Sequence, residues 1–325
     1  MKNIKYFVCF LALIALSSCN PDDYFNPIVE VKLPQQKPKL VVFSEMWEGQ
    51  DTLTVFLTQS RNTLDNKPFP SKKDSMFYVN RSNGRNDTIW YFNTTETADI
   101  VADAKVELFK NEALIATFAK GKKEGFYTTK LAAPLKQDGA TYRLQVSAPN
   151  FETVEATQKL PTPVAIDTVI YRPNVRLTDP SDPLNYFTQD EFGIEFKDPA
   201  GEKNYYTAEG FVEVKNGTYT YSQYLNLHSF DPISSNNFLQ DASFDGKKAI
   251  WREHTYPQHF QSNNKITIYL TALSAAKYTY QQSLSLFYNA QDNPFAEPVV
   301  LYTNIKNGYG LFAMGSFRSF SFKIK

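Results

Sequence analysis

The residues of this chain that could support metal or acid–base chemistry are few. Histidine occurs only at positions 228, 254 and 259, and the last two stand five apart in "WREHTYPQHF", beside Glu253. A zinc site takes three or four ligands, and this pair has neither zinc-finger nor zinc-protease spacing. The pattern therefore favours loop histidines without a metal.

Acidic residues are paired in "DPSDPLN" and "DASFDG", but the twelve-residue calcium-loop pattern is absent from the sequence. Aspartate before proline or glycine is typical of turns. The glycine motifs of phosphate loops, dinucleotide folds and nucleophile elbows are absent too. We therefore expect no catalytic residues, no cofactor and no metal. A hydrolase built from scattered carboxylates stays open as an alternative.

Cysteine is the remaining reactive residue type, at Cys9 and Cys19. The opening "MKNIKYFVCFLALIALSSC" is basic at Lys2 and Lys5, then apolar, then small, which is the layout of a secretory signal. The apolar run is shorter than the about 20 residues that span a bilayer. Its end, "LSSC", resembles the bacterial lipobox, whose cysteine is lipidated and becomes the mature N-terminus. We expect residues 1–18 to be a lipoprotein signal peptide and Cys19 to be the lipid anchor. The alternative is an ordinary signal with a chance cysteine.

Net charge limits the classes of partner that this protein could bind, and the cysteine count limits its disulfides and metal sites. The chain has 34 basic and 34 acidic residues, and loss of residues 1–18 takes two lysines, leaving 32 against 34. This slight negative balance argues against nucleic acid or an anionic membrane surface as partner. With Cys9 removed and Cys19 acylated, no thiol remains for a disulfide or a zinc knuckle.

Length and composition predict two β-rich domains. Aromatic residues make up 15% of the 325 residues, which favours strands over helices. We expect an acidic, proline-rich tether over 19–38 and an immunoglobulin-like β-sandwich over 39–160, with a polar, loop-like insertion at 61–93. Pro161 and Pro163 mark the boundary to a second β-rich domain over 165–325.

Periodicity places the elements within these domains. Alternation predicts strands around Leu53–Leu57, Tyr142–Val146 and Ile266–Leu270, and Asn216-Gly217 between alternating runs predicts a hairpin. One amphipathic helix is expected at about 274–290, capped by Ser274.

The C-terminal motifs carry a family resemblance. "NPFAEPVV" from Asn293, "LYTNI" from Leu301 and "GYGLF" from Gly308 follow a tyrosine-rich helical stretch. This order resembles the closing signature of a Bacteroidota lipoprotein family, domain of unknown function 4249. Looser agreement upstream extends the resemblance over essentially the whole mature chain.

The resemblance implies a function. Family members are commonly encoded beside TonB-dependent outer-membrane receptors, so it implies a non-enzymatic accessory in nutrient uptake, with such a receptor as partner. Asp22 and Asp23 resemble the export signal that sends these lipoproteins to the outer surface of the outer membrane. The alternatives are an acidic tether facing the periplasm and a stand-alone adhesion or cell-envelope structural lipoprotein.

Two further sets of residues are candidate sites. Four short motifs resemble the Asp-Ser/Thr-aliphatic sequon that Bacteroidota use for O-glycosylation, at Thr52, Ser75, Thr88 and Thr168, although Asp-Thr is also a common start of a strand. Trp251, Tyr256 and Phe260 lie in a long aromatic-polar stretch and are candidate contacts for a ligand or partner. Ordinary packing under a loop explains these three equally well.

Overall fold

The fold is given by a computed structural model whose described residues are 37–61, 71–80, 87–96, 99–178, 182, 184–216, 219–225, 227, 238–257, 260, 263–291 and 296–324. The chain divides into two compact units, Met1–Lys37 and Pro38–Lys325. The expected signal peptide, Cys19, Asp22 and Asp23 lie outside the described residues. All elements below belong to the second unit.

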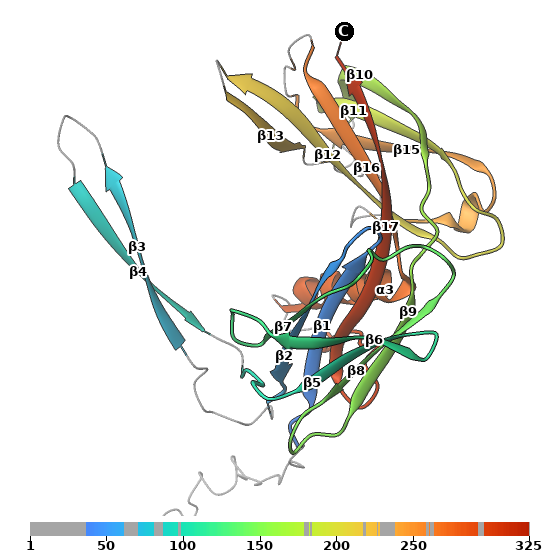
Figure 1. The fold of residues 1–325 in the computed structure, drawn as a ribbon. Helices are drawn as coiled ribbons and strands as arrows, with labels where there is room; N and C mark the ends of the chain where they lie inside the picture. The colour runs from blue at the N-terminus through green and yellow to red at the C-terminus, as the bar shows by residue number, and fades with distance from the viewer. Residues whose placement is uncertain are drawn as a thin grey trace, which may run out of the picture. The chain divides into compact units, whose positions relative to one another are not determined.

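The described chain is mainly β, as expected, with a single α-helix among its residues (Figure 1). The first nine strands are β1 Leu40–Trp47, β2 Thr52–Gln59, β3 Ser71–Asn80, β4 Asp87–Glu96, β5 Lys105–Lys110, β6 Ala113–Lys120, β7 Phe126–Lys130, β8 Thr141–Ser147 and β9 Val154–Lys159. The later elements are β10 Ile166–Thr178, β11 Tyr186–Lys197, β12 Tyr205–Asn216, β13 Tyr219–Leu225, β14 Phe238–Gln240, the 3-10 turn η2 Asp241–Ser243, β15 Lys248–Thr255, β16 Lys265–Leu273, α3 Ala275–Gln291 and β17 Tyr309–Lys323.

One large mixed sheet runs through both halves of this unit. Its order is β13-β12-β16-β17-β1-β2-β7-β6-β5-β8-β9, with β14 also paired to β12, and a smaller sheet has the order β10-β11-β15. The C-terminal strand β17 pairs in parallel with β1, from Val41↔Tyr309 to Trp47↔Gly315. It then pairs antiparallel with β16, from Leu273↔Gly315 to Lys265↔Lys323. The last strand of the chain therefore joins the N-terminal strands to the C-terminal ones.

Two glycines permit this pairing. Gly310 has φ +108°, and a Cβ there would lie 2.0 Å from the carbonyl oxygen of Val42. At Gly315, where the parallel pairing meets the antiparallel one, a Cβ would lie 2.2 Å from the ring of Trp47. Side chains at either position would push β1 away from β17.

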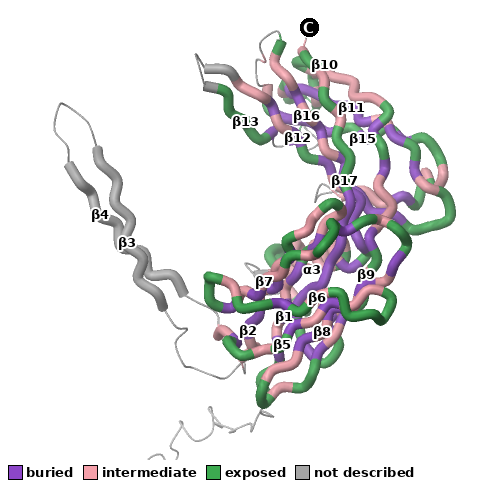
Figure 2. Tube along the Cα trace, in the orientation of Figure 1, coloured by how far each residue is buried: buried purple, intermediate pink, exposed green. Residues whose placement is uncertain are grey.

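The first core fills a sandwich formed by strands of the N-terminal half and β17. It contains the alternating residues expected to face inward on β2 and β8, together with Phe312 and Met314 from β17. In Figure 2 the residues of these strands alternate mainly between buried and intermediate. This core is sandwich-like, as the period-2 pattern predicts.

The second core lies between the β10-β11-β15 sheet and one face of β12, β16 and β17. Phe192, Ile194 and Phe196 from β11 meet Ile266, Ile268 and Leu270 from β16. Phe320 and Phe322 pack against the same core, so β17 contributes to both cores. The first core uses residues 40–160 together with Ile305, Phe312 and Met314, and the second core uses residues from Val164 onward.

The helix and the hairpin predicted around Asn216-Gly217 both agree with their sequence signals. Ser274 Oγ accepts a hydrogen bond from the Lys277 N–H at 3.4 Å, as an N-cap does. α3 then packs Ala276 and Tyr280 on Leu311 and its neighbours in β17. The β12–β13 hairpin forms as well, and its last paired residues are Asn216 and Tyr219.

The expectation of a loop at 61–93 is wrong for residues 71–80 and 87–93, which belong to strands. Strands β3 and β4 pair over ten residues each, from Ser71↔Glu96 to Asn80↔Asp87, and form a sheet of their own. Lysine, asparagine and aspartate are frequent in this segment, so its overall composition suggested a loop despite the β-branched and aromatic residues that favour strands. Among the described residues, no helix is long and apolar enough to cross a membrane.

Candidate functional site

The three aromatic residues expected to contact a partner lie in different environments. Trp251 is 5% exposed and belongs to the second core, opposite Ile194 on β11. Phe260 packs edge-on against Tyr171 with ring centroids 5.7 Å apart. Tyr256, just past the end of β15, is 65% exposed. Only Tyr256 presents the surface that a contact residue needs.

Strand β15 carries a charged group on the face opposite Trp251. His254 lies across from Glu191, with Nε2 3.5 Å from a carboxylate oxygen. The same carboxylate accepts hydrogen bonds from Arg172 at 2.8 Å and from Arg252 at 3.0 Å. Burial lowers the pKa of the His254 imidazole, and Glu191 opposes that shift. Two arginines therefore pair with one acid, and the His254 imidazole lies beside them, which explains how Glu191 is accommodated while buried.

Glu253, one residue earlier, faces the second core. It lies across from Phe192 and is 1% exposed, and neither carboxylate oxygen has a hydrogen-bond partner among the described residues. Burial raises the pKa of this carboxyl to about 8. A carboxyl in such a place is held protonated at neutral pH, because the charged form is poorly solvated there.

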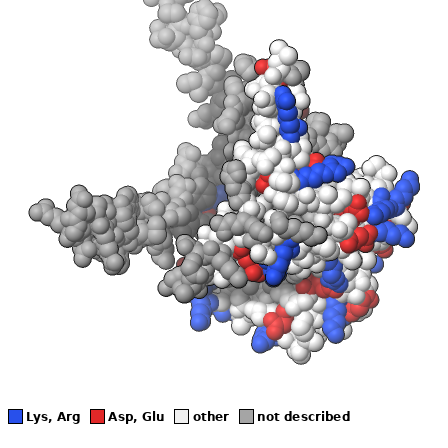
Figure 3. All heavy atoms as spheres, turned by 90° about the horizontal axis from the view of Figure 1, so that it is seen from above, with Lys and Arg blue, Asp and Glu red and all other residues white. Residues whose placement is uncertain are grey.

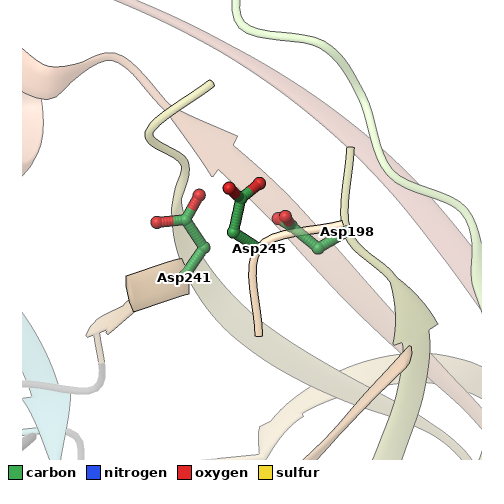
Figure 4. A group of neighbouring side chains, drawn as sticks. All are labelled: Asp198, Asp241 and Asp245. Atoms are coloured by element: carbon green, nitrogen blue, oxygen red, sulfur yellow. The ribbon is translucent and has the colours of Figure 1, made fainter. Parts of the chain in front are cut away.

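Three aspartates from separated parts of the chain form a tight cluster of carboxylates among the described residues. Asp198 follows β11, Asp241 begins η2 and Asp245 follows it, and their carboxylate oxygens lie within 4.8 Å of one another (Figure 4). The sequence placed Asp241 and Asp245 in a turn but gave no sign that Asp198 joins them. That residue is 43 positions before Asp241, and the pairings of β11 with β15 and of β12 with β14 bring the segments together.

Protein donors already bind these carboxylates. Asp198 accepts hydrogen bonds from the Tyr206 hydroxyl and from the Gly246 N–H at 3.0 Å. Asp241 accepts from the Asn204 N–H at 2.7 Å, and Asp245 accepts from the Gly201 N–H at 2.8 Å. The donors offset the repulsion between neighbouring carboxylates.

The chemistry open to this cluster is limited by its burial. Asp198 and Asp241 are both buried, and only Asp245 is exposed. A glycoside hydrolase that works with two carboxyl groups needs them on either side of the substrate bond, about 5 Å or more apart, in an open cleft. The cluster instead connects the turn after β11 to the turn before β15. Oxygen ligands of this kind suit a hard cation, but the donors named above occupy several of their lone pairs.

The four sequon residues lie on strands. Thr52 begins β2, is exposed and donates a hydrogen bond to Asp51 Oδ1 at 2.9 Å. Thr168 is in β10, opposite Glu195. Ser75 and Thr88 lie in β3 and β4, opposite Phe92 and Val79, and their side chains are outside the description. Modification of the four stays a prediction.

The fold defines a class: a mainly β protein in which two hydrophobic cores share the C-terminal strand. The chain belongs to the family described as Domain of unknown function (DUF4249), whose profile matches residues 27–321. This confirms the resemblance drawn from the closing motifs.

Other comparisons add little. A search of curated proteins gives no match. Among solved structures, a mutant alpha-2-macroglobulin from Salmonella is similar at 10% identity, with a TM-score of 0.23. That likeness covers 90% of this chain but 15% of the other, so the chain spans a small part of that protein, and the low TM-score carries no argument.

Proposed function

We propose that the chain is a lipid-anchored protein of the outer-membrane surface that serves as the non-enzymatic binding accessory of a TonB-dependent uptake system. The observation that carries the proposal is the sequence "LSSC" directly after a basic and apolar leader. Acyl chains on Cys19 would each bury many methylenes, at about 0.8 kcal/mol per methylene, which gives stable anchoring.

The distribution of charge on the folded unit argues against nucleic acid as the partner. On the face drawn in Figure 3, basic and acidic side chains are interspersed rather than gathered by sign. Surfaces of this kind provide no single electrostatic attraction for a polyanion. Tyr256 is the expected contact residue whose exposure supports recognition of a partner.

The non-enzymatic part of the proposal is supported by the buried acids. Glu253 faces an apolar core, and the oxygens of Asp198 and Asp241 bind backbone and side-chain donors. Asp198 and Asp241 link neighbouring turns through these donors, and all three acids are buried away from a substrate, which supports a binding protein over a hydrolase.

Fractionation of cells expressing the full chain tests the anchor. Wild type is expected to sediment with the envelope and to have an acylated Cys19 by mass spectrometry, whereas Cys19→Ala is expected in the soluble fraction. Protease treatment of intact cells should cut the wild-type chain if it is displayed outside. Sedimentation of Cys19→Ala with the envelope contradicts the proposal.

Affinity purification from native membranes in mild detergent tests the partner. We expect the chain to bring down a large β-barrel receptor, and Tyr256→Ala to lower the yield of that receptor. Tyr288→Ala, an exposed tyrosine on α3, is the matched control. Purification of the chain alone from membranes that contain the receptor contradicts the accessory role.

A further inference from the structure

A row of four aromatic rings crosses the large sheet on the face opposite the second core. We call Tyr224, Phe211, Tyr269 and Phe317 the aromatic row; they come from β13, β12, β16 and β17 in that order. Their neighbours in sequence on β12 and β16, such as Val212 and Ile268, point the other way into the second core. Alternation therefore places the row on the outer face of the sheet.

The rings form a continuous chain of contacts. Successive centroids are 5.4 Å apart for Phe211 and Tyr224, 5.7 Å for Phe211 and Tyr269, and 5.8 Å for Tyr269 and Phe317. The interplanar angles of 72°, 89° and 64° are edge-to-face geometries, which aromatic pairs favour. Tyr224 is 53% exposed and Phe317 is 42% exposed, so both ends of the row face solvent.

Polar groups lie between and beside these rings. Glu209 is exposed, lies directly across from Tyr269, and forms no ion pair with another of the described residues. Burial and the nearby Glu209 charge raise the pKa of the Tyr224 hydroxyl. On the other side, Thr267 and Ser321 share a hydrogen bond of 2.8 Å, and Ser319 is exposed opposite Tyr269.

Aromatic rings next to acceptor oxygens on this face indicate the chemistry of the ligand. Sugar rings have apolar C–H faces and a rim of hydroxyl donors, so they need aromatic surface next to acceptor oxygens. The cores of protein interfaces are instead depleted in charged residues such as Glu209, and anionic membrane surfaces attract lysine and arginine. On the same face, Glu213 and Lys265 form an ion pair at 2.9 Å, and the exposed Lys323 lies across from Lys265.

We infer that the outer face of β13, β12, β16 and β17 binds a neutral glycan chain, with the aromatic row against the sugar C–H faces and Glu209 accepting sugar hydroxyls. The inference goes beyond the proposed function, because such a face would serve a transporter accessory or an adhesion protein equally. It also differs from the expected contacts, since Trp251 belongs to the second core and Tyr256 follows β15.

Calorimetric titration of the purified full chain tests the inference. The detergent must carry no sugar head group, and the probes are neutral oligosaccharides of glucose, xylose, mannose and galactose. We expect at least one to bind, and the double variant Tyr224→Ala/Phe317→Ala to lose about tenfold or more in affinity, as loss of a central contact does. Glu209→Gln should weaken binding while leaving the row in place.

Tyr288→Ala is the control, because it removes an equally exposed tyrosine from α3. Circular dichroism should be unchanged in all variants. The inference is overturned if none of the oligosaccharides binds, or if the double variant binds as tightly as wild type. These outcomes are independent of Cys19 acylation and of receptor copurification, so the two proposals can fail separately.

Discussion

Glu253 and His254 are neighbours in sequence with opposite environments. His254 shares the Glu191 carboxylate with two arginines, while Glu253 faces Phe192 and the second core. The sequence showed both residues together in one polar stretch, which suggested a loop. The prediction of a loop was wrong because the period-2 alternation of a strand continues through Trp251, Glu253 and Thr255. An acidic residue, Glu253, occupies one of the inward positions and disguises this alternation.

Burial of Glu253 predicts a pH dependence of stability. The folded-state pKa is about 8, whereas an unfolded chain gives about 4.3. The folded state therefore holds a proton that the unfolded state has lost, and stability falls as pH rises between these values. The contribution of Glu253 to the free energy of unfolding should be greatest below about pH 4, fall by up to about 1.4 kcal/mol per pH unit between the two pKa values, and level off above about pH 8.

Glu253→Gln should flatten that slope, because a neutral amide does not titrate. Urea unfolding at a series of pH values measures the effect. Glu202→Gln, at an exposed carboxylate, is the control and should keep the wild-type slope. Parallel curves for wild type and Glu253→Gln would assign the pH dependence to another group.

At the scale of elements, the junction on β17 depends on Gly315. A methyl group there would meet the Trp47 ring at 2.2 Å, so Gly315→Ala forces either the ring or β1 to move. We expect a loss of about 1–3 kcal/mol in the free energy of unfolding. Denaturant unfolding gives the value.

Gly193→Ala is the matched change within a strand. A Cβ at Gly193 would have its nearest contact at 3.5 Å, from Ile170, which is an ordinary packing distance. Its effect should stay within about 0.5 kcal/mol. Equal effects of the two substitutions would mean that Trp47 adapts freely to Gly315→Ala.

Local patterns predicted some elements and could not predict their partners. The strands around Leu53 and Tyr142 and the helix after Ser274 follow from periodicity and capping, and each formed. The parallel pairing of Val41 with Tyr309 had no local signal, because it joins segments from opposite ends of the chain. The aromatic row and the Asp198 cluster depend on other pairings between strands distant in sequence, so their residues appeared unrelated in the sequence.

At the scale of the whole molecule, the shared strand predicts a single unfolding transition for residues 38–325. Trp47 is on β1 and contacts Gly315 on β17, whereas Trp251 lies within the second core, so the first reports on the β1–β17 pairing and the second on the C-terminal half. In a Trp90→Phe background, variants that keep only Trp47 or only Trp251 should unfold with the same midpoint.

A core truncation sharpens this measurement. Leu144→Ala in the first core should lower the free energy of unfolding by about 2–5 kcal/mol. The midpoint reported by Trp251 should fall with that reported by Trp47. Two separate midpoints would show that the halves unfold as independent domains, as the linear division at 160–165 predicts.

The pairing of β17 also bears on biosynthesis. Tyr309–Lys323 is translated after β1 and β16, its two partner strands, and until it emerges both cores lack the side chains that this strand contributes. A nascent polypeptide in that state exposes apolar surface at both cores, which favours aggregation. A truncation before Tyr309 is therefore expected to leave both cores incomplete rather than to leave one folded half.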